Sequence, residues 1–147
     1  MSKKLVQFFY FIAVHTGNKA LEVINFHTHD RASLGIKNLK PGAANQMWAF
    51  VPCGSGFYEI INKHSNMVLD DSTFSRPGGV VYQYHRHGGA NQHWRVKKAG
   101  EEDSIQFFSK CGNLVLDVGD QRKDDGAVIC VWHDWKGPNQ TWRLIRA

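Results

Sequence analysis

Short apolar segments alternate with turns containing glycine or asparagine along the whole chain. In each third, an apolar segment (residues 9–12, 57–61 and 105–108) leads through such a turn into a second segment that ends in an acidic residue (residues 20–22, 68–70 and 115–117). No stretch has apolar residues at helical spacing, so the pattern predicts short β-strands. We expect four strands in each third, roughly twelve in all, in an all-β fold.

A repeated tetrapeptide divides the chain into three parts. The form Asn-Gln-x-Trp occurs at residues 45–48, 91–94 and 139–142, and successive tryptophans are 46 and 48 positions apart. We therefore predict one domain over residues 1–147, built from repeats at about 5–52, 53–100 and 101–147. A unit of this length cannot bury its own apolar face, so the repeats must share one core. We expect the tryptophans to lie in that core and the glutamine of each motif to tie neighbouring loops together.

Composition and charge agree with a folded, turn-rich β protein. Hydrophobic residues make up 42% of the chain and aromatic residues 12%, which is too rich for a disordered chain. The net charge of +5 is modest and scattered along the sequence. A nucleic-acid-binding domain usually concentrates its positive charge on one stripe, so we expect no nucleic-acid partner.

The first residues imitate a secretory signal, because Lys3 and Lys4 precede an apolar stretch from Leu5 to Val14. That stretch contains Gln7, lacks a small-x-small cleavage site and is too short to span a membrane. We therefore expect a buried first strand, no membrane insertion and a cytoplasmic location.

The cysteine content agrees with that compartment. Cys53, Cys111 and Cys130 are an odd number of cysteines in a chain that is long enough to form a core without disulfides. Pairing of Cys111 with Cys130 remains open, but free buried thiols are the prediction.

Three Gln-x-Trp motifs in register, each downstream of a Leu-Asp-like dipeptide and a Gly-x-x-Val-x-x-aromatic stretch, carry a resemblance to a known family. The chain resembles the ricin B-type (R-type) lectins from about Leu5 to Arg146. The resemblance implies a β-trefoil, in which three pseudo-symmetric four-stranded repeats share one core. It also implies that carbohydrate is bound by the acid after the second strand, an aromatic residue on the third strand and the asparagine of Asn-Gln-x-Trp.

These residue types suit a sugar for physical reasons. A carboxylate accepts short, charge-assisted hydrogen bonds from two neighbouring hydroxyl groups. An aromatic plane covers the patch of C–H groups on one face of a galactose-like ring. An amide donates and accepts hydrogen bonds at the ring edge.

The third repeat contains the complete set. The resemblance implies that Asp117 binds the hydroxyl pair, Trp132 stacks on the ring and Asn139 bonds to the ring edge. Gln140 is expected to support Asp117, and Trp135 to widen the binding surface.

The second repeat is nearly as complete. Asp70 corresponds to the acid, Tyr84 to the aromatic residue, and Asn91 and Gln92 to the amides. His87 lies on the following loop, where we expect it to reach a sugar hydroxyl.

The first repeat departs from the pattern. Glu22 is one methylene longer than aspartate, and the spacing places Asn38 where the other repeats have an aromatic residue. Asn45 and Gln46 remain. We expect this site to bind weakly or not at all.

Other candidate chemistry is weaker. The pairs His27 and His29, and His85 and His87, have the spacing of zinc ligands, but no third ligand recurs in register, so we expect solvated loop histidines and no metal. No phosphate-binding loop or nucleophile motif is present in the sequence. We therefore predict that the chain is not an enzyme and needs no cofactor.

The function hypothesis is a lectin that recognises glycans ending in galactose or N-acetylgalactosamine. Two sites per chain, or more in a possible homodimer, would supply avidity. A free-standing lectin of this kind resembles fungal defence lectins that act on external or ingested glycans. One alternative is a β-trefoil that binds proteins instead, as a protease inhibitor or cytoskeletal binder. Another is a targeting domain that accompanies an enzyme on another chain.

Overall fold

A computed structural model describes residues 8–100 and 103–147 of the chain. Twelve strands lie in these residues, four in each repeat. The first repeat contains β1 (Phe9–Val14), β2 (Lys19–Val23), β3 (Leu34–Asn38) and β4 (Met47–Pro52). The second contains β5 (Phe57–Asn62), β6 (Val68–Asp71), β7 (Val81–Tyr84) and β8 (Trp94–Lys98). The third contains β9 (Ile105–Ser109), β10 (Val115–Val118), β11 (Ile129–Trp132) and β12 (Trp142–Arg146).

Short 3-10 turns occur at two equivalent places in the repeats. Two follow the strand that carries the acid, η2 (Ile24–Phe26) and η5 (Gly119–Gln121). Two others contain the Asn-Gln pair of the repeated motif, η3 (Ala44–Gln46) and η4 (Ala90–Gln92).

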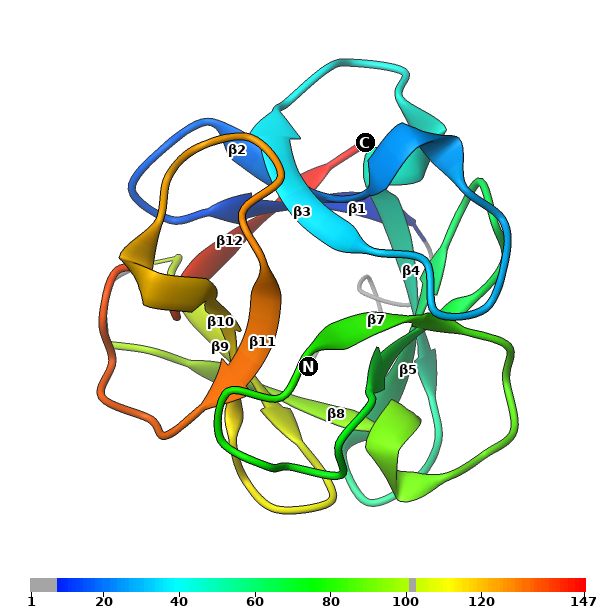
Figure 1. The fold of residues 1–147 in the computed structure, drawn as a ribbon, viewed down its shortest axis with the longest axis vertical. Helices are drawn as coiled ribbons and strands as arrows, with labels where there is room; N and C mark the ends of the chain where they lie inside the picture. Colours follow the sequence, from blue (N-terminus) through cyan, green and yellow to red (C-terminus); the bar gives the residue numbers. More distant parts are fainter. Residues whose placement is uncertain (1–7, 101–102) are drawn as a thin grey trace.

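Six strands close into a barrel. β1 pairs with β12 and β4, β5 pairs with β4 and β8, and β9 pairs with β8 and β12, all antiparallel. The remaining strands form the hairpins β2–β3, β6–β7 and β10–β11, with β3, β7 and β11 arranged around the centre of the view in Figure 1. This arrangement is a β-trefoil, which confirms the expected fold class.

Backbone hydrogen bonds join the three hairpins to one another. The Gly126 amide donates to the Ile36 carbonyl at 3.1 Å, and the Val131 amide donates to the Gly79 carbonyl at 3.0 Å. A Cβ atom at Gly35 would lie only 3.0 Å from the Gly126 Cα, so a side chain here would crowd the contact between the two hairpins. The loops of one repeat are thereby held against the strands of the next.

The motif tryptophans are fully buried in the shared core, as predicted. Each indole Nε1 also donates to the carbonyl of the leucine that precedes the acid of its own repeat, at 3.0, 3.0 and 3.3 Å. The pairs are Trp48 with Leu21, Trp94 with Leu69, and Trp142 with Leu116. A core residue therefore fixes the strand that carries each candidate binding acid.

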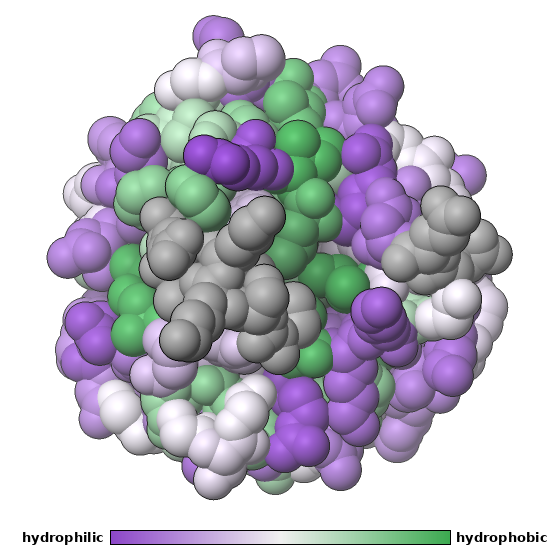
Figure 2. Space-filling view, turned by 180° about the vertical axis from the view of Figure 1, so that it is seen from behind, coloured by the Kyte–Doolittle hydropathy of each residue, from purple (hydrophilic) through white to green (hydrophobic). Residues whose placement is uncertain are grey.

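The amino-terminal prediction is only partly covered by the structure, because residues 1–7 lie outside the described residues. The described part of that stretch, β1, is a barrel strand. In the part of the chain that the structure describes, no helix has the length and apolarity needed to cross a membrane. Figure 2 shows the face opposite the hairpins, where hydrophobic residues gather near the middle and hydrophilic residues predominate at the rim.

All three cysteines are free thiols. Cys130 is buried, while Cys53 and Cys111 are half-buried. The pairing of Cys111 with Cys130 that the sequence left open is absent from the structure.

Candidate functional site

The third repeat brings its acid and amides together in one buried group. Asp117 lies on β10 opposite Cys130 of β11 and is 3% exposed. Its Oδ1 accepts a hydrogen bond from Asn139 Nδ2 at 2.9 Å, and its Oδ2 accepts one from Gln140 Nε2 at 2.8 Å. The Cys130 thiol is a further, weak donor to Oδ1 at 3.9 Å, whereas Oδ2 keeps a lone pair beyond its amide bond and can accept another donor.

An open hollow of about 430 Å³, called here the third-repeat hollow, lies beside Asp117. Trp132 and Trp135 line it with side chains that are 43% and 51% exposed. Gly78 of the second repeat also lines it, and a Cβ at this glycine would lie 3.5 Å from the Trp132 ring. The hollow thus combines a buried carboxylate, two exposed indoles and a wall from the neighbouring repeat.

The electrostatics of Asp117 leave its negative charge available to a ligand. Burial raises the pKa of its carboxyl above the ordinary value of 3.8, although the hydrogen bonds from Gln140 and Asn139 work in the opposite direction. No lysine, arginine or histidine among the described residues forms an ion pair with it. The two amides therefore hold the carboxylate without neutralising it.

The Asn139 side chain forms most of its hydrogen bonds within the protein. Its Nδ2 donates to Asp117 and to the Val118 carbonyl, the latter at 3.2 Å, which uses both amide hydrogens. Its Oδ1 is buried and has no hydrogen-bond partner in the described structure. The side chain therefore orients Asp117, and its one remaining hydrogen-bonding group is the buried Oδ1.

The second repeat repeats this geometry around Asp70, which is 2% exposed. Asn91 Nδ2 donates to Asp70 Oδ1 at 3.0 Å and Gln92 Nε2 donates to Oδ2 at 3.1 Å. Burial raises the pKa of the Asp70 carboxyl, against the lowering effect of the two amides and of His87. His87 Nε2 lies 3.9 Å from Oδ2, so the histidine borders the Asp70 carboxylate.

Tyr84 is half-buried and is held by residues of its own and the preceding repeat. Its ring lies 5.8 Å from the His87 ring and 4.5 Å from the His85 ring. The Arg31 guanidinium lies 5.2 Å from the Tyr84 ring centroid, and His85 Nδ1 pairs with Asp30 Oδ2 at 2.9 Å. Residues of the first repeat therefore support the Tyr84 ring of the second repeat. In the same way, Gly78 of the second repeat borders the Trp132 ring of the third.

The first repeat holds its acid differently. Asn45 Nδ2 and Gln46 Nε2 both approach the same oxygen, Glu22 Oε1, at 3.4 and 3.3 Å. These bonds are longer than those to Asp70 and Asp117. Glu22 lies in a hollow of about 350 Å³, the first-repeat hollow.

The strand register corrects the sequence alignment in this repeat. Lys37, not Asn38, occupies the strand position of Tyr84 and Trp132, because it pairs with Ala20 two residues before the acid. Gly35 pairs with Glu22, as Tyr82 and Cys130 pair with the acids of the other two repeats. The loop between strand and amides has one extra residue here, since Gln46 Oε1 accepts from a backbone amide six residues away, whereas in the other repeats the separation is five. Asn38 contributes its backbone carbonyl to Gln46.

The predicted role of the three glutamines is confirmed. Each Nε2 donates to the acid of its repeat and to the backbone carbonyl of the residue that follows Lys37, Tyr84 or Trp132. Each Oε1 accepts a hydrogen bond from the backbone amide two residues after that carbonyl. Those carbonyls belong to Asn38, His85 and His133, and those amides to Lys40, His87 and Trp135. The glutamine thus joins the acid to the loop that carries His87 or Trp135.

Sequence reasoning missed the contributions that cross between repeats. Gly78, Arg31 and Asp30 belong to a different repeat from the site that they border. The only signal was that Gly78 and Gly79 are adjacent glycines, which is typical of a tight turn or a close approach.

The two His-x-His pairs make other contacts. The rings of His27 and His29 lie 4.9 Å apart, and His85 bonds to Asp30. Within residues 8–100 and 103–147, no group of three histidine, cysteine or acidic side chains is placed to hold a metal ion.

The sequence of this chain matches the profile of one protein family. The sequence profile described as ricin-type beta-trefoil lectin domain-like matches residues 6–84, 44–132 and 90–147. No curated protein sequence matches the chain.

Solved structures agree with this match. The designed three-fold symmetric protein ThreeFoil is 33% identical with a TM-score of 0.88, over 93% of this chain and 97% of that one. An exo-β-1,3-galactanase from Clostridium thermocellum is 30% identical with a TM-score of 0.90, and the match covers 96% of this chain but only 30% of the enzyme. The ricin B-like lectin of Macrolepiota procera, solved with lactose, matches over the whole length of both chains at 18% identity and a TM-score of 0.84, which supports the fold.

The profile match extends over nearly the whole chain, and the fold, the buried tryptophans and the repeated acid–amide groups agree with it. Family membership supports carbohydrate binding as the general activity. The chain belongs to the ricin-type β-trefoil lectin-like family.

Proposed function

We propose that this chain is a lectin that binds galactose- or N-acetylgalactosamine-ended glycans through its second and third repeats, without catalysis. The observation that carries the proposal is the third-repeat hollow, where the buried Asp117 carboxylate and the exposed Trp132 ring border the same space. Asp117 accepts two neighbouring hydroxyls, and Trp132 covers the C–H face of the ring.

The choice of galactose-type sugars has support outside the chain. The Macrolepiota lectin was solved with lactose, which ends in galactose, and the Clostridium enzyme is named a galactanase. A shallow site of this kind binds one sugar weakly, with a Kd of about 0.1–10 mM, so binding to two sites matters for avidity.

A glycan array with the wild-type chain and the double variant Asp70→Ala/Asp117→Ala tests the proposal. Each aspartate accepts two amide bonds, so circular dichroism must accompany the array to confirm that the variant is folded. We expect the wild type to bind galactose-ended glycans, free galactose to inhibit this binding, and the folded double variant to lose it. Unchanged binding by the double variant would refute the site assignment. A wild-type chain that binds no glycan would favour the protein-binding alternative.

A further inference from the structure

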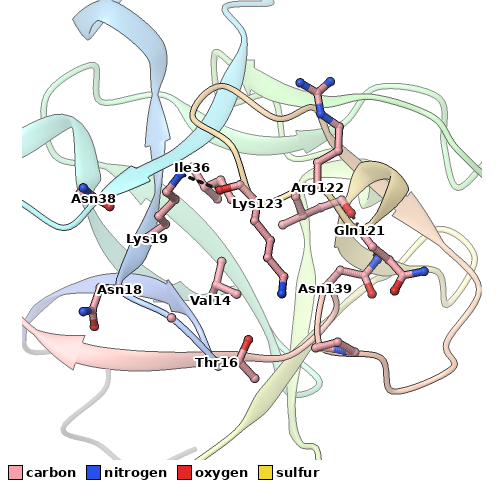
Figure 3. Close-up of a pocket in the computed structure, with 13 residues that line it drawn as sticks. Val14, Thr16, Asn18, Lys19, Ile36, Asn38, Gln121, Arg122, Lys123 and Asn139 are labelled. Carbon is pink, nitrogen blue, oxygen red and sulfur yellow. Dashed lines mark hydrogen bonds between the residues drawn. The ribbon is translucent and has the colours of Figure 1, made fainter.

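A second hollow, of about 320 Å³, lies between the first and third repeats (Figure 3). We call it the inter-repeat hollow. Val14, Ile36 and Val118 provide apolar lining, while Thr16 and Asn18 of the β1–β2 turn provide polar groups. Such a mixture suits a sugar ring, which has C–H faces and hydroxyl edges.

The inter-repeat hollow adjoins the third-repeat hollow. Gln121, Arg122 and Asn139 line both. These shared residues place the space beside Trp132 next to the space beside Val14. A glycan whose end occupies the first space has a short path into the second.

The charged side chains that line the inter-repeat hollow are cationic, and two of them are paired with carboxylates beside it. Its lining contains three cationic residues and no aspartate or glutamate among the described residues. Lys19 Nζ is engaged by Asp125 at 2.9 Å and by the Lys123 carbonyl at 2.6 Å. Arg122 forms an ion pair with Asp124.

Lys123 is the cation that remains available. Its ammonium makes no hydrogen bond or ion pair within the described part of the chain. In Figure 3 its side chain extends into the space between Val14 and Asn139, whereas Arg122 points away from that space. A positive charge beside apolar lining and neutral polar groups is a complementary site for an anion.

We propose that the inter-repeat hollow binds an acidic sugar residue, carrying a carboxylate or a sulfate group, next to the sugar held by Asp117 and Trp132. Lys123 pairs with the anionic group, Thr16 and Asn18 bond to hydroxyls, and Val14 contacts the C–H face. The inference rests on the proposed function, since it extends the ligand of the third repeat.

Isothermal titration with three ligands tests this inference. The ligands are lactose, lactose carrying a sulfate group on galactose, and lactose carrying an acidic sugar with a carboxylate. In low salt we expect the wild type to bind at least one acidic ligand about fivefold more tightly than lactose. High salt should remove this preference, because it screens exposed charges.

The variant Lys123→Gln should lose the preference for the acidic ligand and keep the affinity for lactose. Lys98→Gln is the matched control, because Lys98 is exposed on β8 and lines neither hollow. It should retain the preference.

Two results would overturn the inference while leaving the proposed function in place. One is equal affinity of the wild type for neutral and acidic ligands, and the other is an undiminished preference in Lys123→Gln. A wild-type chain that binds none of the three ligands would instead contradict the proposed function itself. A preference for the sulfate or for the carboxylate ligand supports the inference and identifies the anionic group.

Discussion

At the scale of single residues, the exposed and buried members of the third site have separable roles. Trp132 is 43% exposed, so its loss removes little core packing. Asp117 is 3% exposed and bonds to two amides, so its loss disturbs both binding and structure. The tryptophan is therefore the cleaner probe of sugar binding.

We predict that Trp132→Ala weakens galactoside binding at the third site roughly five- to tenfold, because the stacking surface is lost. Titration calorimetry measures the loss, and the melting temperature should stay close to that of the wild type. Phe74→Ala is the control, since Phe74 is 64% exposed and lines neither the third-repeat nor the inter-repeat hollow. If the Phe74 variant weakened binding as much as the Trp132 variant, the stacking role would be wrong.

Lowering the pH should abolish galactoside binding by Asp70 and Asp117 while the chain is still folded. Burial raises the pKa of the Asp70 and Asp117 carboxyls above 3.8. Protonation replaces a charge-assisted acceptor with a neutral acid, so galactoside affinity should fall as the pH drops through those raised pKa values. Binding measured from pH 7 down to pH 4 should decline at a higher pH than an ordinary aspartate would give.

The contribution of these carboxyls to stability has the opposite sign. A carboxyl whose pKa is higher in the folded chain than in the unfolded chain binds protons more tightly when folded. Its contribution to stability is therefore fully present below the unfolded pKa and is lost as the pH rises through the folded pKa. Circular dichroism at the same pH values should show a folded chain where binding is already weak. Simultaneous loss of fold and binding would contradict this account.

At the scale of elements, the Asn-Gln turn is the device that joins a strand to a binding loop. Gln140 joins Asp117 on β10, the His133 carbonyl and the Trp135 amide. Gln46 makes the equivalent bonds in the first repeat, to Glu22, Asn38 and Lys40. The same structural element thus occurs with and without an aromatic binding surface.

We predict that Gln140→Leu lowers the free energy of unfolding by roughly 2–4 kcal/mol, because buried hydrogen-bonding groups lose their partner. It should also weaken binding at the third site, because the loop that carries Trp135 is released. Gln46→Leu is the matched comparison and should have a similar cost in stability without a loss of glycan affinity. Urea denaturation and titration calorimetry measure the two effects. A loss of affinity in the Gln46 variant would show that the first repeat binds sugar.

At the scale of the whole molecule, the sites are shared between repeats. Gly78 of the second repeat borders the third site, and Arg31 of the first repeat lies against Tyr84 of the second. A single repeat would therefore lack part of its binding surface as well as a core.

We predict two galactoside sites in each chain. Titration calorimetry should give a stoichiometry near two for the wild type. Trp132→Ala or Tyr84→Ala should leave one site of unchanged affinity and one site weakened roughly five- to tenfold, and the double variant should have two weakened sites. Glu22→Gln should leave the stoichiometry at two, since Lys37 and Lys40 replace the aromatic residues in the first repeat. A stoichiometry of three, reduced by Glu22→Gln, would contradict the inactive first repeat.

Much of the fold and of two sites was predictable from the sequence, because the information is local and repeated. The spacing of Trp48, Trp94 and Trp142 indicated three repeats around one core. The constant offsets between acid, aromatic residue and amide grouped Asp117 with Trp132, and the structure places both beside one hollow. The loop before Asn45 is one residue longer than its counterparts. The constant offset therefore assigned the aromatic position of the first repeat to Asn38, whereas the strand pairing assigns it to Lys37.

The sequence by itself determined the three-fold β architecture, the buried tryptophans and the identity of the acids, since each follows from the order of residues within a repeat. Only the tertiary structure decided which repeat supports which site, which hydrogen bonds Asn139 has left, and that Lys123 points into the space beside Val14. These features depend on contacts between residues as far apart as Lys19 and Lys123. Spacing along the chain does not encode such contacts, because they arise only when the barrel closes and brings the repeats side by side.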